Sequence, residues 1–152
     1  MASTVTSGTL KVILTEQITV NSTDYGSRHE FSIYPISEVS KRIISTAGTG
    51  STSIALFGSS GSAGQYYDSN VRYLRITNLD NANFATLRFT GDASTDFAIR
   101  LDPTGSHIIA STSTTGVVDY TDISGVTLED LTEIAATADT AAVDLELFVA
   151  SA

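Results

Sequence analysis

The sequence contains no cysteine and no tryptophan, only two prolines, and charged residues at just 16%. Without cysteine the chain forms neither disulfides nor thiolate metal sites, and its redox compartment cannot be read from composition. Apolar runs are short and no charged-then-apolar leader opens the chain, so we expect neither a membrane span nor a secretory signal. In place of charge the chain has 22 threonines and 20 serines, which suit strands and turns better than helices.

The net charge of −9 is unevenly placed along the chain. All eight Lys and Arg lie in residues 1–100, where eight Asp and Glu balance them, whereas residues 101–152 hold nine acids and no Lys or Arg. A chain without clustered cations is not expected to bind nucleic acid, because phosphate contacts need them. The acidic third indicates either a solubilising face or a dock for a basic protein surface.

Apolar and polar residues alternate with period two along most of the chain, which predicts strands. Residues 9–20 place four apolar side chains on one face: Val12, Leu14, Ile18 and Val20. Glu16 interrupts this row, which indicates an edge strand or a contact with a partner. In the next alternating segment Pro35 cannot donate to a ladder, so it should end the strand or lie at an edge.

Further strands are predicted from residue 38 onward, although residues 37–42 could alternatively form a helical turn. The expected strands cover residues 38–46, 52–57, 71–77, 84–90, 97–102, 106–111, 117–121 and 143–149. The three central strands, about ten residues apart, are typical of a meander, and Asp102–Gly105 fits a type I turn. Leu128, Leu131 and Ile134 have the spacing of one helical turn, the only other helix expected. The apolar strand at 143–149 should be inserted in a sheet.

About nine or ten short strands with little helix predict an all-β fold, a two-sheet sandwich. We favour a jelly roll of about eight strands, with an immunoglobulin-like sandwich left open. Residues 1–152 should form a single domain with a short flexible N-terminal arm at 1–8. The Gly58–Gly64 loop has no side chains that could build a core, and we expect it to be mobile.

Residues that could support catalysis or metal binding are few. His29 and His107 have no other donors at metal-ligand spacing, and Asp80, Asn81 and Asn83 indicate a turn rather than a calcium loop. A glycoside hydrolase would need a carboxylate pair, for which the candidates are Asp119, Asp122, Glu129 and Asp130. These acids fall in polar loop segments, where carboxylates are usually solvated. We therefore expect no enzyme activity, no cofactor and no metal site.

Four arginines lie on the central strands: Arg72, Arg75, Arg88 and Arg100. They could pair within the chain with Asp96 or Asp102, or present forked donors to acids of a neighbouring subunit. The candidate contacts with copies of the chain or with another partner are Glu16, Arg72, Arg75, Arg88, Arg100, Glu129 and Asp130. A carbohydrate-binding module is an alternative, with Tyr66 and Tyr67 as its stacking residues.

Three segments resemble small virion structural proteins of tailed phages, particularly those of cyanobacteria and marine bacteria. The first is Ser7–Glu16 followed by Asp24–Ser27, and the second is Val71–Asp80. The third is Ala135–Ala142 leading to Asp144–Ala150. None of them is a catalytic fingerprint, and together they span most of the chain.

The resemblance implies a non-enzymatic component of a phage particle, made in the host cytoplasm. The preferred role is a capsid cement or decoration protein, which would bind outside the shell and stabilise contacts between major capsid subunits. Its partners would be the major capsid protein and copies of itself, as a homotrimer, with no nucleic acid and no membrane. The alternative is a tail, baseplate or fibre-associated protein that attaches to the host surface.

Overall fold

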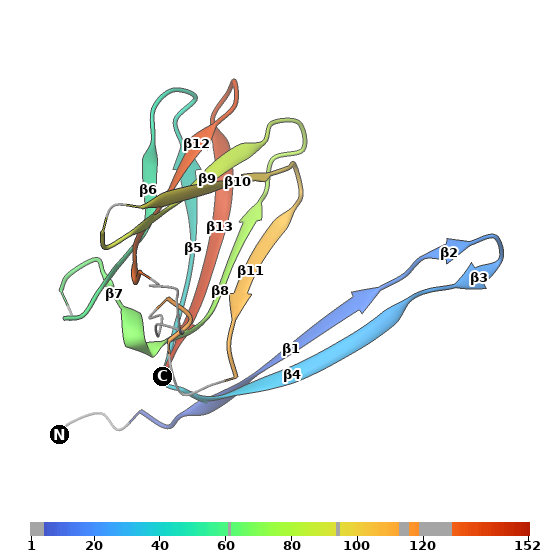
Figure 1. The fold of residues 1–152 in the computed structure, drawn as a ribbon, viewed down its shortest axis with the longest axis horizontal. Coiled ribbons are helices and arrows are strands. Elements are labelled where there is room, and N and C mark those ends of the chain that lie inside the picture. The colour runs from blue at the N-terminus through green and yellow to red at the C-terminus, as the bar shows by residue number, and fades with distance from the viewer. Residues whose placement is uncertain (1–4, 61, 94, 113–115, 119–128) are drawn as a thin grey trace.

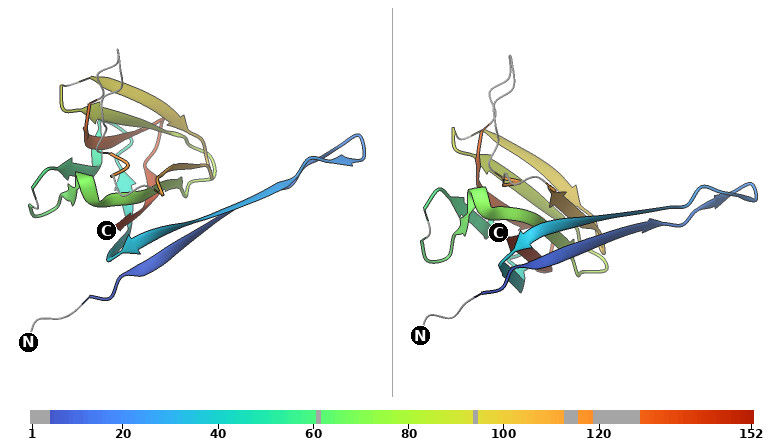
Figure 2. Two further views of the ribbon diagram at one scale, coloured as in Figure 1. Left: turned by 60° about the horizontal axis from the view of Figure 1, so that its bottom comes forward. Right: turned by 90° about the horizontal axis from the view of Figure 1, so that it is seen from below.

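The computed structural model describes residues 5–60, 62–93, 95–112, 116–118 and 129–152 (Figure 1). These ranges are almost entirely strands and loops, with one short 3-10 helix, η1 (Asp68–Asn70). Within them, no helix has the length and apolar character needed to cross a membrane. The fold consists of a two-sheet sandwich and a long hairpin that extends away from it (Figures 1 and 2).

Two sheets make up the sandwich, and each is named here after one of its strands. The β5 sheet has the order β11-β8-β13-β5 and comprises β5 (Glu38–Thr46), β8 (Val71–Asn78), β11 (Ser106–Ala110) and β13 (Val143–Ser151). The β6 sheet has the order β10-β9-β12-β6-β7 and comprises β6 (Thr52–Gly58), β7 (Tyr66–Tyr67), β9 (Ala85–Gly91), β10 (Asp96–Leu101) and β12 (Leu131–Ala138). The predicted all-β sandwich is confirmed, and these strand orders are compatible with a jelly roll.

The main core lies between the two sheets and is built from alternate residues of their strands. Buried side chains from both sheets form one cluster that includes Leu74, Leu147, Leu87, Phe89 and Ile134. The C-terminal strand β13 lies between β8 and β5, so the prediction that it is inserted in a sheet is confirmed. The alternation along β13 explains this position, because its odd-numbered residues face the core.

The predicted central meander is wrong. Strands β9 and β10 do pair as an antiparallel hairpin, but β8 belongs to the other sheet, where it pairs with β11 and β13. The alternation of apolar and polar residues shows which residues of a strand share a face, but it does not show to which sheet the strand belongs. The type I turn is also wrong, because Thr104 has a φ of 62°, whereas type I requires a negative φ there.

The predicted helical turn through Leu128, Leu131 and Ile134 is also wrong, although Leu128 itself lies outside the described residues. Leu131 opens β12, whose pairing with β9 shifts by one residue between Leu131 and Glu133. This bulge places Leu131 and Ile134 in the same core although they are three residues apart. The helical alternative at residues 37–42 is wrong as well, since β5 begins at Glu38.

The strand predicted at 117–121 is not seen at Val117 and Val118, which are buried bends, and its remainder lies outside the described residues. The mobility predicted for the Gly58–Gly64 loop and the N-terminal residues stays a prediction. Of the latter, residues 1–4 are outside the described part, and Gly8 already begins a strand.

Residues 8–36 form the hairpin, which we call the arm. Its long strands are β1 (Gly8–Glu16) and β4 (Ser27–Ile36), paired antiparallel, and its tip is closed by β2 (Thr19–Val20) and β3 (Thr23–Asp24). In all views the arm, drawn in blue, crosses one end of the sandwich and then extends well beyond it (Figures 1 and 2). Only Ser37 separates β4 from β5, and its N–H donates to the carbonyl of Ser151 at 2.9 Å.

Candidate functional site

The root of the arm packs on the sandwich through a second apolar cluster. Val12, Ile33 and Ile36 of the arm are buried against Tyr73 and Ala150, and partly buried neighbours complete the cluster: Leu10, Phe31, Ile108 and Phe148. Burial raises the pKa of the Tyr73 phenol in this contact. Leu10 and Val12 are paired with Ile33 and Phe31, so these four residues share one side of the ribbon, which we call the inner face.

The sandwich surface beneath the arm is the outer face of the β5 sheet, the side away from the main core. Strand pairing aligns its residues in rows: Val39 with Ala150 and Tyr73, Lys41 with Phe148 and Arg75, and Ile43 with Glu146. The arm root covers the part of this face around Tyr73, Phe148 and Ala150. Val39 and Ile43 stay exposed, so a strip along β5 remains uncovered.

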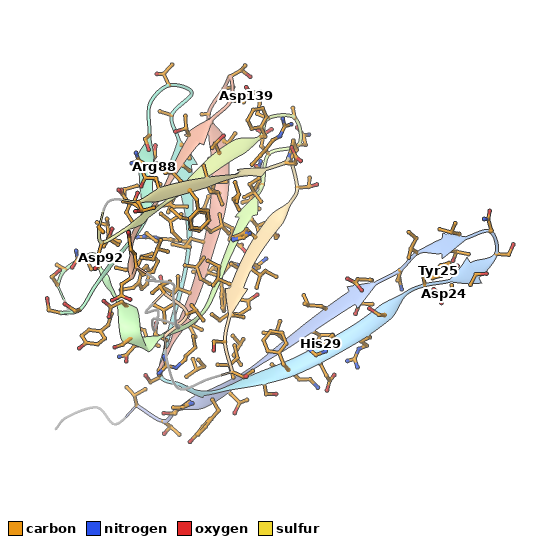
Figure 3. The ribbon with its side chains drawn as sticks, in the orientation of Figure 1. Asp24, Tyr25, His29, Arg88, Asp92 and Asp139 are labelled. Atoms are coloured by element: carbon orange, nitrogen blue, oxygen red, sulfur yellow. The ribbon has the colours of Figure 1, made fainter. Side chains whose placement is uncertain are left out.

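Beyond the root the arm leaves the sandwich and keeps apolar side chains in solvent. Leu14 follows Val12 on the inner face and lies opposite His29, whose ring is 5.8 Å from that of Phe31. Nearer the tip three more large side chains are exposed: Ile18, Val20 and Tyr25. Figure 3 shows Tyr25 near the tip, far from the side chains of the sandwich, and His29 midway along the arm. Exposed apolar groups gathered on one element are typical of a contact surface.

The opposite side of the arm is more polar. Glu30 lies between two cations, 3.0 Å from Lys11 Nζ and 2.9 Å from the Arg28 guanidinium. These pairs are exposed and contribute little stability, but they neutralise most of the arm's charge. Residues 8–36 contain two cations and three acids, so about eight of the nine excess negative charges belong to the rest of the chain.

Side-chain contacts hold the shape of the arm where its long strands end. Glu16 accepts a hydrogen bond from Ser27 Oγ, and the Gly26 N–H donates to Asp24 Oδ1 at 2.8 Å. A Cβ on Gly26 would lie 2.7 Å from the carbonyl oxygen of Glu16, so only glycine fits at this close approach. Glu16, predicted as an edge or contact residue, thus lies on a ribbon whose two long strands each have one free edge.

A charge network borders the uncovered strip of the outer face. Glu146 Oε2 lies 2.9 Å from Lys41 Nζ, and Glu146 Oε1 accepts a hydrogen bond of 2.6 Å from Arg75. The hydrogen bond from Lys41, together with the charges of Lys41 and Arg75, holds the pKa of Glu146 below its ordinary value. Arg75 also lies 6.0 Å from the Phe148 ring. The network has two cations and one acid, and a second acid, Asp144, lies exposed on the same face two residues from Glu146.

The four predicted arginines do not form one site. Arg72 is only 7% exposed and donates to the Ser69 carbonyl at 2.5 Å, so it presents little surface to a partner. Arg72 and Arg75 lie on opposite faces of β8, because they are three residues apart in a strand. Arg88 lies 3.9 Å from Asp96 and 4.0 Å from Glu133, and Arg100 lies 2.6 Å from Asp102 and 3.8 Å from the Phe84 ring. The predicted pairing with Asp96 and Asp102 is therefore confirmed for Arg88 and Arg100, and contacts of the four arginines with other subunits stay predictions.

Glu129 holds the turn between β9 and β10. It accepts a hydrogen bond of 2.7 Å from the Thr95 hydroxyl and lies directly over Gly91, where any Cβ would collide with it. The Asp130 carbonyl accepts the Asp92 N–H at 2.9 Å, so both predicted contact residues take part in fixing this loop. The other two hydrolase candidates, Asp119 and Asp122, lie outside the described residues.

Asp80 caps a turn, as predicted in preference to calcium binding. Its Oδ1 accepts the backbone N–H groups of Asn83 at 2.6 Å and Ala82 at 2.7 Å, and these hydrogen bonds lower the pKa of Asp80. Within the described ranges, no three His, Asp or Glu side chains come together as a metal site would require. Burial lowers the pKa of His107, whose ring lies 5.5 Å from that of Phe89, so His107 is part of the packing.

The two tyrosines named for a carbohydrate module do not form a platform together. Tyr66 is half-buried, and its hydroxyl donates to Ser40 Oγ at 3.0 Å, whereas Tyr67 is exposed. Large exposed apolar side chains also lie on the arm and on β5, among them Tyr25, Val39 and Ile43. For the arm, the only sign in the sequence that such residues would remain uncovered was Glu16, which interrupts the apolar row.

Comparisons with known proteins identify no relative: no family model, no curated protein and no solved structure matches this chain.

Proposed function

We propose that this chain is a non-enzymatic structural protein of a tailed-phage virion. More specifically, we propose that it acts as a capsid cement or decoration protein, which binds the outer shell and stabilises contacts between major capsid subunits. The observation that carries this proposal is the arm. A two-stranded ribbon with exposed apolar side chains and free edges is suited to reaching a neighbouring subunit, and it has no obvious use in a self-contained enzyme.

The fold supports the same proposal by analogy. A two-sheet sandwich compatible with a jelly roll is an architecture that viral capsid proteins use, although lectins and other proteins use it too. Two of the carboxylates discussed above, one a hydrolase candidate and one a turn residue, serve local structure. Glu129 fastens a loop and Asp80 caps a turn.

The three segments that resemble virion proteins fall in the parts of the fold that matter for this role. Ser7–Glu16 contains β1 and Asp24–Ser27 leads into β4, so both belong to the arm, and Val71–Asp80 contains β8, on which the arm root packs. Ala135–Ala142 contains the second half of β12, and Asp144–Ala150 contains most of β13. A particle protein present in many copies gains from avidity, so each arm contact can be weak while the shell is still stabilised.

Locating labelled protein on intact particles by cryo-electron microscopy tests the proposal. Density on the outside of the shell, between neighbouring capsid subunits, is the expected result. Density confined to the tail or baseplate would replace the cement role with the alternative one, and absence from purified particles would overturn both.

A matched variant separates the role of the arm from that of the sandwich. Glu16 and Ser27 are paired across the ribbon, so residues 17–26 can be replaced by Asn-Gly, a turn that closes such a hairpin. The arm root and the sandwich are unchanged in this variant. We expect it to fold and to lose binding to shells that lack the protein. Full binding would show that the arm is not the attachment element.

A further inference from the structure

The outer face of the β5 sheet and the inner face of the arm each continue beyond the interface that they make with each other. On the arm, Leu14 and Glu16 follow Val12 along the inner face, past the edge of the sandwich. On the sheet, Val39 and Ile43 extend the covered patch along β5, an edge strand. The uncovered parts of the arm and of the sheet are therefore extensions of two surfaces that already pack against each other within one chain.

We propose that these uncovered surfaces bind each other between two copies of this chain. The outer part of one arm, at Leu14 and Glu16, docks on the uncovered strip of the next copy, at Val39, Lys41 and Ile43. The inference concerns self-association, and it does not rest on the proposed function.

The apolar parts of the two surfaces match in kind. Leu14 is 42% exposed on the arm and Ile43 is 63% exposed on the strip. The arm root shows that ribbon residues of this face pack on this sheet face, because Val12 and Ile33 are buried there against Tyr73. Burying exposed aliphatic side chains in the same manner favours association, at about 25 cal/mol for each Å² of apolar surface removed from water.

The charges of the two surfaces are complementary. Glu16 lies on the inner face of the arm, two residues beyond Leu14, and is an acid on an otherwise nearly neutral element. Lys41 lies between Val39 and Ile43 on the strip and is the cation that Glu16 would meet there, although it also pairs with Glu146. Two sandwiches that each carry most of a −9 charge repel each other, and an ion pair between Glu16 and Lys41 would offset part of that repulsion.

The geometry favours a second copy over contact within the chain. Ser37 joins the arm directly to β5, and the arm leaves the sandwich at that end (Figure 1). From Leu14 to the tip at Val20 the ribbon extends by about 20 Å at the usual rise per residue, away from the molecule's own strip. A contact between an arm and a different surface on the next copy is head-to-tail, and it either closes into a ring or continues as an open chain.

Crosslinking between two single-cysteine variants tests the proposal, because the natural sequence contains no cysteine. We expect Leu14→Cys protein mixed with Ile43→Cys protein to give a covalent dimer with a short thiol crosslinker, containing one copy of each. Leu79→Cys, at a similarly exposed apolar residue in the loop after β8, is the matched control for Ile43→Cys. The proposal would be overturned if Leu14→Cys gave no more crosslinked dimer with Ile43→Cys than with Leu79→Cys.

Sedimentation of the uncrosslinked protein gives an independent result. The wild type should self-associate, and Leu14→Asp or Ile43→Asp should each weaken the association at least about tenfold, equivalent to about 1.4 kcal/mol. Leu79→Asp should leave the association unchanged. A wild type that stays monomeric across its soluble range, or association that both substitutions leave intact, would overturn the proposal.

Discussion

Val12 and Leu14 point to the same side of β1, yet Val12 is 8% exposed and Leu14 is 42% exposed. The edge of the sandwich runs between them. Val12 belongs to the cluster with Ile33 and Tyr73, whereas Leu14 lies opposite His29 on the free part of the ribbon. Substitutions at the root should therefore affect stability, and those farther out should affect association.

Two isoleucines of the arm provide a matched test of this division. Ile33 is 1% exposed at the root, and Ile13 is 47% exposed on the other side of the ribbon. Ile33→Ala should lower the free energy of unfolding by about 2–5 kcal/mol, because it leaves a cavity under the arm. Ile13→Ala should lower it by less than about 0.5 kcal/mol. Urea denaturation measures both, and equal losses would show that the root is not packed as described.

The stability of the outer face should depend on pH through Glu146. Its pKa is lowered, chiefly by the hydrogen bond from Lys41, so the ionised form is favoured in the folded state. The resulting stability is present above the ordinary glutamate pKa and is lost as the pH falls through the lowered value. Glu146→Gln should therefore cost about 1 kcal/mol at neutral pH, and the difference from wild type should close at acid pH.

Glu30→Gln is the control for that prediction. Glu30 also lies between two cations, but its side chain is 43% exposed, against 15% for Glu146. Solvent screens the exposed pairs, so this substitution should cost less than about 0.5 kcal/mol at any pH. Urea melts of the three proteins at neutral and acid pH give the comparison. If the difference in unfolding free energy between wild type and Glu146→Gln persisted at acid pH, the ion-pair network would be ruled out as its cause.

Asn78 is a buried side chain that joins two sheets. Its Nδ2 donates to the carbonyls of Asn83 at 2.9 Å and Leu101 at 3.2 Å, and its Oδ1 accepts the Asp80 N–H at 2.9 Å. Asn78→Ala would leave buried backbone groups without these partners, at a cost of about 2–3 kcal/mol. Asn81→Ala, at an exposed position in the same loop, should stay within about 0.5 kcal/mol of wild type in thermal or urea melts.

Gly116 is required by a close approach of the backbone. A Cβ at this position would lie 2.2 Å from the Asp68 carbonyl oxygen and 2.9 Å from Ser69 Cα, neither of which can move without shifting η1. Gly116→Ala should destabilise the protein by about 1–3 kcal/mol. Gly8→Ala, whose Cβ would have its nearest neighbour at 4.0 Å, is the control and should be nearly neutral in the same melts.

The sequence predicted the strands and the sandwich because buried and exposed residues alternate along each strand. The sequence wrongly predicted a helical turn at Leu131 and Ile134, because their spacing of three residues is that of a helix. A bulge in β12 supplies the extra residue that brings both side chains to the same core. Nothing in a single sequence distinguishes a bulged strand from one turn of helix at that spacing.

The arm could be predicted only in part. Alternation placed Val12, Leu14, Ile18 and Val20 on one face, but it could not show that only Val12 would be covered. Glu16 in that row was the one sign of an exposed ribbon. Nor could the sequence pair Arg75 with Glu146, since the two meet through the register of β8 and β13, 71 residues apart in the chain.

The single residue between the arm and the sandwich has a mechanical consequence. Ser37 continues β4 into β5, and its N–H is bonded to Ser151 at the end of β13. A pull on the arm is thus transmitted to β5, which forms nine residue pairs with β13. Force on the arm therefore enters the sheet at an edge strand and passes to β13, which lies between β5 and β8.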